Sequence, residues 1–176
     1  MSKTYVGIDI GKQGAIAMMY PDGTIETIPM PMIKTEVDYH MVAQRITHLA
    51  EAYRGQLHIV FERLGVIFGS SKQVAWSMGS QSGAIEMICI CQNIPYTKVN
   101  AKDWQKTMFQ GLDEITKISK LSKTGKPSRD TKAMALVAVK RIFPQQKLTF
   151  GLKATVPQDG LIDAVLMAEY ARRNNL

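Results

Sequence analysis

Apolar residues alternate with small and polar ones near the start of the chain, and this pattern predicts a β-strand over residues 4–11. Val6, Ile8 and Ile10 alternate there with glycines and with Asp9. A strand buried on both faces normally excludes an unpaired carboxylate, because removing a charge from water without a partner is costly. Asp9 is therefore the first residue of the chain that needs a functional explanation.

The spacing of apolar residues in the rest of the sequence predicts a meander of strands followed by alternating strands and helices. Asp22-Gly23 is a strong hairpin signal, so the first three strands are expected to form an antiparallel meander. The later strands are expected at 15–20, 24–30, 57–61 and 95–99. The helices are expected to start at Thr35, Ser71, Asn100, Ser128 and Asp159 and to end near residues 53, 93, 109, 143 and 173. This order predicts an α/β fold with a mixed five-stranded sheet and helices on both faces.

The composition fits a single soluble domain, which we expect to span residues 1–176. Hydrophobic residues make up 45% of the chain and charged residues 21%. No stretch approaches ~20 uncharged apolar residues, so neither a membrane span nor a signal peptide is expected. The two cysteines, Cys89 and Cys91, would point away from each other on a helix. We therefore expect free thiols and a cytoplasmic or equivalent reducing compartment.

The net charge of +7 is concentrated in one part of the chain. Residues 98–153 contain 13 basic and four acidic side chains, a local net charge of +9, whereas the remainder has a net charge of −2. A basic segment on a near-neutral body predicts a surface for a polyanion such as a nucleic acid. A basic loop at 111–130 places five such residues at three-residue steps: Lys117, Lys120, Lys123, Lys126 and Arg129. The other interpretation of this run is a solvated loop that binds nothing.

Four acidic residues form a candidate metal site. Asp9 lies in the first strand, Glu62 ends the fourth, and Asp159 and Asp163 share one face of the last helix. Taken singly, Asp159 could be a helix cap and Glu62 a solvated strand end. If the first and fourth strands are neighbours and the helix crosses their ends, the carboxylates converge and raise one another's pKa values unless a cation compensates. Such a cluster favours Mg²⁺, and two ions would activate a water for attack on a phosphodiester.

Five stretches of the sequence resemble the RuvC family of Holliday junction resolvases, within the RNase H-like superfamily. In chain order they are YVGIDIGKQGAIAM, IVFERLG, NAKDWQKTMFQG, DTKAMALVAVKRIFP and QDGLIDAVLMAEYARR. The resemblance implies an RNase H-like fold, a homodimer, dependence on Mg²⁺ with Mn²⁺ as a substitute, and paired symmetric nicks in four-way DNA junctions. The four-residue spacing of the last two acids and the longer loop after Gly111 are more similar to the phage and organelle branch of the family.

The same resemblance implies roles for individual residues. The metal-binding and catalytic acids would be Asp9, Glu62, Asp159 and Asp163. Lys106 falls where the family has a lysine that contacts the phosphate and would be catalytic, and Lys132 matches a second lysine position. Lys102 lies one turn before Lys106 on the same helical face. These three lysines and the basic residues of the 111–130 loop are the expected contacts with DNA.

Several alternatives stay open on the sequence. GIDIG also opens phosphate loops in actin-like and sugar-kinase folds, but no second Gly-rich loop follows, so no nucleotide cofactor is expected. The chain could also be a non-catalytic DNA-binding module, or a nuclease acting on flaps or RNA–DNA hybrids. Gly79 and Gly83 make the helix at 71–93 either a dimer seam or ordinary core. Trp104 either packs in the core, the commoner fate of a tryptophan at helical spacing, or stacks on a base.

Overall fold

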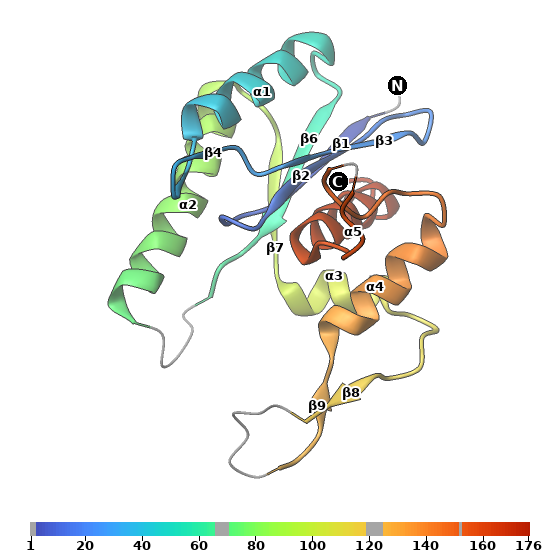
Figure 1. Cartoon of the computed structure of the whole chain (residues 1–176). Helices are drawn as coiled ribbons and strands as arrows, with labels where there is room; N and C mark the ends of the chain where they lie inside the picture. The colour runs from blue at the N-terminus through green and yellow to red at the C-terminus, as the bar shows by residue number, and fades with distance from the viewer. Residues whose placement is uncertain (1–2, 66–70, 119–124, 152) are drawn as a thin grey trace.

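The structure is a computed structural model that describes residues 3–65, 71–118, 125–151 and 153–176. It contains fourteen strands and helices within these residues, labelled in Figure 1. The strands are β1 (Thr4–Asp9), β2 (Ala15–Met19), β3 (Ile25–Pro29), β4 (Met32–Ile33), β5 (Glu36–Val37), β6 (Leu57–Glu62), β7 (Tyr96–Val99), β8 (Thr116–Lys117) and β9 (Ser128–Arg129). The helices are α1 (Tyr39–Ala52), α2 (Lys72–Cys91), α3 (Ala101–Met108), α4 (Thr131–Ile142) and α5 (Asp159–Arg173). No helix in these ranges is both long enough and apolar enough to span a membrane.

The central sheet has five strands in the order β3-β2-β1-β6-β7. β1, β2 and β3 form the antiparallel meander that the Asp-Gly turn predicts. β6 and β7 then add in parallel, as strands connected through helices do. The predicted mixed five-stranded sheet is therefore confirmed, and β1 is its central strand.

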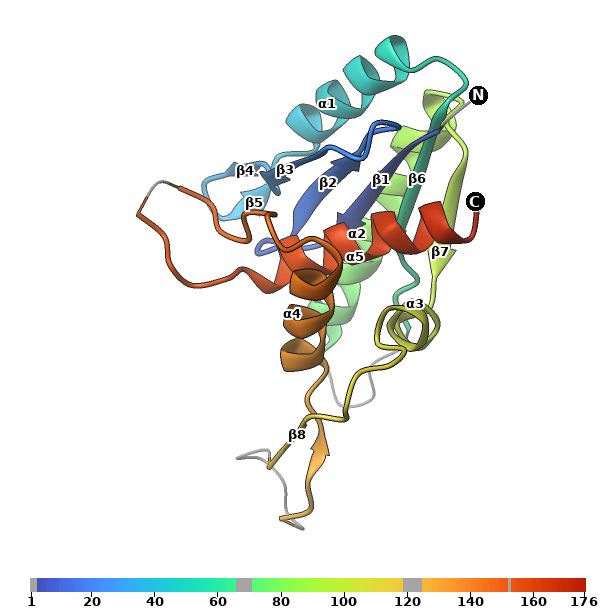
Figure 2. The same cartoon turned by 90° about the vertical axis from the view of Figure 1, so that its right-hand side faces the viewer.

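Helices cover both faces of this sheet, as predicted (Figure 1). α1 and α2 lie on one face, and α3, α4 and α5 lie on the other, an arrangement that Figure 2 shows from the side. Each face has its own buried cluster, and β1 contributes to both by its two-residue period. Val6 and Ile8 pack with the first cluster, whereas Tyr5 packs with the second. Asp9, two and four residues after Gly7 and Tyr5, is therefore on the α5 side of β1.

Two predicted helix starts are wrong, and local hydrogen bonds explain both. Thr35 does not cap α1: residues 36–37 pair with 32–33 in a small ladder, and the Asp38 side chain accepts from Met41 N at 3.0 Å. Ser128 does not cap α4, because it pairs with Lys117 in a second ladder. Asp130 is the cap there, and its carboxylate accepts from Ala133 N at 3.2 Å. In each case a nearby aspartate replaces the expected hydroxyl cap.

The basic segment at 111–130 is not simply a loop, because β8 and β9 pair at its base. In both views this ladder extends away from the sheet, on the side where β6 and β7 end (Figures 1 and 2). Residues 119–124, which include two of the five basic residues of this segment that were predicted to bind DNA, lie outside the described parts of the chain.

Helix α5 lies directly against β1 and β2, and glycines permit this close approach. A Cβ atom on Gly7 would collide with the carbonyl oxygen of Ala164 and would lie 2.8 Å from Ala168 N. Both atoms belong to the α5 backbone, which cannot move aside without displacing the helix. Gly7 is therefore a packing residue, and it fixes how near α5 comes to the sheet.

We predict that Gly7→Ala lowers the free energy of unfolding by about 1–3 kcal/mol, the usual cost of overpacking a core. Gly79→Ala on α2 is the matched control, because a Cβ there meets no atom within 4 Å. It should raise stability by roughly 0.5–1 kcal/mol, as alanine does in a helix. Urea denaturation measures both. A Gly7→Ala variant as stable as the wild type would contradict the close packing of α5 on β1.

Candidate active site at the end of β1

The four acids of the candidate metal site come from three adjacent elements. Parallel pairing matches Ile8 of β1 with Phe61 of β6, so Asp9 and Glu62 follow side by side at the ends of these strands. Both side chains are on the α5 side, since the neighbouring inward positions belong to the cluster under that helix. α5 begins at Asp159 and carries Asp163 one turn later. The strand register and one helix thus bring all four acids to the same end of the sheet.

A second glycine brings the start of α5 against Asp9. A Cβ on Gly160 would lie 2.7 Å from Asp9 Oδ2, and it would also collide with the carbonyl oxygen of Gln13. The first turn of α5 therefore lies on the β1–β2 connection. This contact explains why a glycine stands between the acids of the QDGLID motif.

The electrostatics of this end of the sheet are those of crowded, half-buried carboxylates. Burial is the main cause that raises the pKa of Asp9 to about 7, and the charges of Glu62 and Asp159 add to it. Burial likewise raises the pKa of Asp163 to about 7, with further contributions from Asp9, Glu62 and Asp159. Lys132 opposes both shifts. The site therefore concentrates negative charge that a single lysine only partly balances.

Two of the four acids are engaged by other side chains. Lys132 Nζ lies 2.5 Å from Asp159 Oδ2, and both side chains of this pair are at least half exposed. Trp104 donates its indole N–H to Glu62 Oε1 at 2.7 Å. An exposed ion pair is worth little, so Lys132 can be displaced from Asp159 at low cost. The Trp104 contact is different in kind, because Trp104 is completely buried.

The four carboxylates are suitable ligands for a hard divalent cation, although they do not yet stand in the geometry of a metal site. Within the described ranges, no three His, Cys, Asp or Glu side chains stand in metal-binding geometry. Four carboxylates from adjacent elements, two of them (Asp9 and Asp163) with raised pKa values, are nevertheless the oxygen ligands that Mg²⁺ prefers. A divalent ion would relieve the repulsion that raises the pKa values of Asp9 and Asp163. The residues present therefore fit such an ion.

The predicted basic contacts are spread over three elements near this end. Lys132 reaches the acids from the first turn of α4. Lys102 and Lys106 are exposed on α3, and neither pairs with an acid in the described parts of the structure. Among those expected DNA-contacting lysines that the structure describes, Lys132 is thus the one that touches the carboxylate cluster.

The basic residues at the base of the hairpin have partners within the protein. Lys117 Nζ lies 2.9 Å from Asp130 Oδ1. The Arg129 guanidinium lies over the Phe109 ring at 5.4 Å, within the range of a cation–π contact. Lys126 is exposed, and Lys120 and Lys123 lie outside the described residues.

The sequence did not reveal the contributions of three residues to this site. The close contacts of Gly7 and Gly160 depend on where α5 crosses the sheet, although both glycines lie inside the motifs. Trp104 was expected to pack in the core, which is correct, but its hydrogen bond to Glu62 was not foreseen. The signal that could have found it is the adjacency of β7 and α3, since α3 begins where β7 ends beside Glu62.

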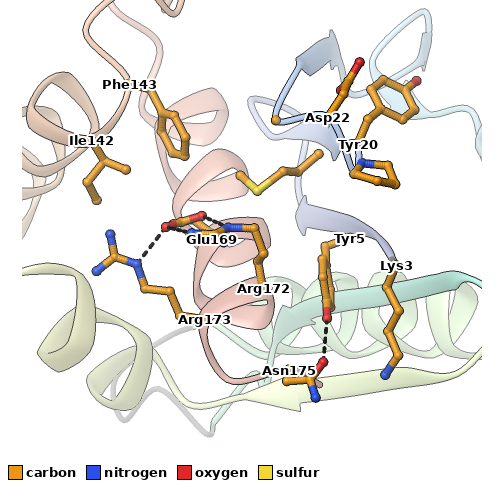
Figure 3. Close-up of a pocket in the computed structure, with 13 residues that line it drawn as sticks. Lys3, Tyr5, Tyr20, Asp22, Ile142, Phe143, Glu169, Arg172, Arg173 and Asn175 are labelled. Atoms are coloured by element: carbon orange, nitrogen blue, oxygen red, sulfur yellow. Dashed lines mark hydrogen bonds and ion pairs between the residues drawn. The ribbon is translucent and has the colours of Figure 1, made fainter. Parts of the chain in front are cut away.

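The structure also contains a hollow of about 650 Å³ at the opposite end of β1 (Figure 3). Its wall includes Tyr5, Arg172 and Arg173, and both arginines point to the buried carboxylate of Glu169. Arg172 Nε and Arg173 Nε each lie 2.7 Å from Glu169. This cluster secures the last turn of α5, where basic residues also complement the helix dipole. It lies at the far end of the strand from Asp9 and contains none of the four acids.

Comparison with known proteins supports the fold. No family model matches the chain. No curated protein matches it either. Among solved structures, the chain is similar to Thermus thermophilus RuvC, with a TM-score of 0.58, 15% sequence identity, and coverage of 98% of this chain and 96% of that one. It is equally similar to T. thermophilus RuvC in complex with a Holliday junction substrate, at 14% identity and the same TM-score and coverage. The chain therefore has a RuvC-like fold of the RNase H-like class.

We predict that Asp163→Asn stabilises the protein in chelator at pH 8 and that this gain disappears near pH 4. The folded-state pKa of Asp163 is raised to about 7 from 3.8, so folded protein binds the extra proton between these values. Its contribution to stability therefore falls as pH rises from about 4 to 7 and stays unfavourable above that range. The asparagine removes this penalty.

Calorimetric melting temperatures of the variant and the wild type at pH 4 and pH 8 measure this effect, and the difference between the two proteins cancels the response of groups that are distant from Asp163. Asp113→Asn, at an exposed position, is the control and should show no such pH dependence. A variant that is no more stable than the wild type at pH 8 would show that Asp163 is not electrostatically strained.

Proposed function

We propose that the chain is a metal-dependent endonuclease that resolves four-way DNA junctions by paired symmetric nicks. The observation that supports this most directly is the group of four carboxylates at the end of β1 and β6 in a RuvC-like fold. The site residues would be Asp9, Glu62, Asp159 and Asp163, and the ion would be Mg²⁺, with Mn²⁺ as a substitute. One of the similar solved structures is described as RuvC in complex with a Holliday junction substrate, and this favours branched DNA as the substrate here.

The chain's own side chains would divide the work as follows. The carboxylates hold the cations, which when bound supply a Lewis acid and lower the pKa of a bound water. Lys132 would leave its exposed pair with Asp159 and take a phosphate oxygen of the DNA. Lys106 on α3 would lie near the scissile phosphate. Its positive charge would stabilise the negative charge that develops there in the transition state. DNA bound over the acids would exclude bulk water from the site while the attacking water stays.

The DNA surface would extend from the acids over α3 and along the β8–β9 hairpin. Lys102 and Lys126 are exposed there, and Lys117 and Arg129 lie at the base of the hairpin. We include Lys120 and Lys123 on their sequence spacing alone. Contacts of this kind follow the phosphate backbone and give affinity without base preference.

A homodimer is part of the proposal, because a four-way junction has two equivalent strands to cut. α2 has a stripe with the 4-3-4-3 spacing of a helix-packing seam, made of Trp76, Ser80, Gly83, Met87 and Ile90. Trp76 is 77% exposed, and Met87 and Ile90 are each more than half exposed. Ile85 and Cys89, on the other side of the helix, are buried against the sheet. The stripe would therefore be free to pack against a second copy.

Two finer points belong to the same proposal. We take residues 1–176 as one nuclease domain with the basic hairpin as an insertion. The four-residue spacing of Asp159 and Asp163, and the long segment after Gly111, favour the phage and organelle branch over the typical bacterial pattern.

The decisive experiment offers the purified protein a synthetic four-way junction, a linear duplex and an RNA–DNA hybrid, each with Mg²⁺ or chelator. We expect metal-dependent paired nicks in the junction and little cleavage of the other two substrates. Asp9→Asn should abolish cleavage, while junction binding measured by gel shift stays within a few-fold of wild type. Glu51→Gln, which neutralises an exposed acid at the C-terminal end of α1, is the matched control and should cut normally. Nicking of the junction by Asp9→Asn at the wild-type rate would refute the site.

We predict that Gly83→Trp on α2 weakens dimerisation and leaves the fold of one subunit intact. A Cβ at Gly83 meets no atom of the same chain within 4 Å, so a large side chain fits the monomer but obstructs the seam. Sedimentation equilibrium measures the association, and circular dichroism checks the fold. Arg54→Trp, at an exposed position beyond α1, is the control and should leave association unchanged. A wild-type protein that is monomeric while it cuts junctions would exclude the dimer.

A further inference from the structure

Trp104 makes the one direct hydrogen bond that the described structure shows to Glu62, and the bond is short. The indole Nε1 lies 2.7 Å from Glu62 Oε1. Hydrogen bonds to ionised acceptors are shorter and stronger than neutral ones, and this distance falls in that range. The indole can only donate, so it leaves Oε2 and the second lone pair of Oε1 available to another partner.

Trp104 itself is held rigidly. Its side chain is 0% exposed and is the largest fully buried one in the described structure. The Phe109 ring packs edge-on to it, with ring centroids 6.0 Å apart and planes at 75°. Arg129 in turn lies over Phe109, so the base of the hairpin covers this aromatic pair. The indole N–H therefore points to Glu62 from a position that the core determines.

Glu62 is the most flexible of the four acids by its chemistry. It has one more rotatable bond than an aspartate, and it is the last residue of β6, where its backbone still pairs with Val99 of β7. Such a side chain loses rotamer freedom when it binds a cation. A buried donor that already fixes one carboxylate oxygen removes part of this cost before the cation arrives. In metal sites generally, ligating carboxylates are themselves hydrogen-bonded, and loss of such a partner typically weakens metal affinity or activity by 10–100-fold.

We propose that Trp104 is a positioning residue: its indole N–H holds the Glu62 carboxylate in the orientation in which it binds a divalent cation. This inference rests on the proposed metal-dependent function and adds to it a residue that is neither a ligand nor a contact with DNA. This role also explains why a tryptophan, which carries an N–H donor, occupies this buried position of α3 in place of a purely apolar residue.

The test is Trp104→Phe, which keeps a buried ring and removes the donor. Mn²⁺ binding, followed by electron paramagnetic resonance without DNA, is expected to weaken by about 10–100-fold. The variant should need more metal than the wild type to cut a four-way junction, and its cleavage rate should recover at high metal concentration. Trp76→Phe is the matched control, because Trp76 is 77% exposed and makes no contact with the acids in the described structure. It should bind Mn²⁺ as the wild type does.

A double-mutant cycle separates positioning from general damage to the core. In a Glu62→Gln background, Trp104→Phe should cause little further loss of Mn²⁺ affinity, because the side chain that the indole orients no longer carries the carboxylate that binds the cation. Equal losses in both backgrounds would overturn the inference, and so would a Trp104→Phe protein with wild-type affinity. A wild-type protein that binds no Mn²⁺ would refute the proposed function and this inference together. A wild-type protein that binds Mn²⁺ while the cycle shows no coupling would refute this inference alone.

If Trp104→Phe does not fold, NMR tests the same contact with Trp104 left in place, by changing Glu62 or adding metal and observing the indole. The indole ¹H–¹⁵N resonance of Trp104 should shift on Glu62→Gln and on addition of Mg²⁺ to the wild type. The Trp76 resonance is the internal reference. A Trp104 resonance that responds to neither change would overturn the inference.

Discussion

The close packing of α5 on β1 is the constraint on which the rest of the site depends. Gly7 lets the helix backbone contact the sheet, and Gly160 lets its first turn contact Asp9. With the helix this near, Asp159 and Asp163 lie beside Asp9. The parallel pairing of β1 with β6 places Glu62 in the same group of acids. A side chain at either glycine would push the helix away from the sheet. The acids would then separate. The packing of the core therefore determines how close the acids of the site lie to one another.

The same packing makes the metal-free protein less stable than it could be. Burial raises the pKa values of Asp9 and Asp163, the charges of the neighbouring acids add to both shifts, and Lys132 opposes them from an exposed pair with Asp159. Clusters of this kind are typical of functional sites, where groups are arranged for chemistry at the expense of stability. The aspartate inside the buried strand is explained by this arrangement. In the proposed function a divalent cation compensates this carboxylate, and the oxygen-rich donor set suits such an ion.

The sheet could be predicted from the sequence because its signals are local. The alternation around Asp9 and the Asp-Gly turn specify strands and their meander, and both are confirmed. The starts of α1 and α4 could not be predicted, because Thr35 and Ser128 are acceptable caps and only the pairing of short ladders excludes them. The four acids could be nominated from spacing and resemblance, and Trp104 could be placed in the core, but its hydrogen bond to Glu62 was missed because it depends on the adjacency of β6, β7 and α3 and joins residues 42 positions apart. Contacts between distant elements are thus what the sequence leaves open.

The central claim is that the acids at the end of β1 form a site for divalent metal. Crystals of the wild-type protein soaked in Mn²⁺, with anomalous diffraction recorded at the manganese edge, test it most directly. The account predicts anomalous density in contact with the carboxylates of Asp9 and Asp163, with the Glu62 side chain still bonded to Trp104. Density only at other acids, such as Glu169 at the far end of α5, or none on the protein at millimolar Mn²⁺, would contradict it.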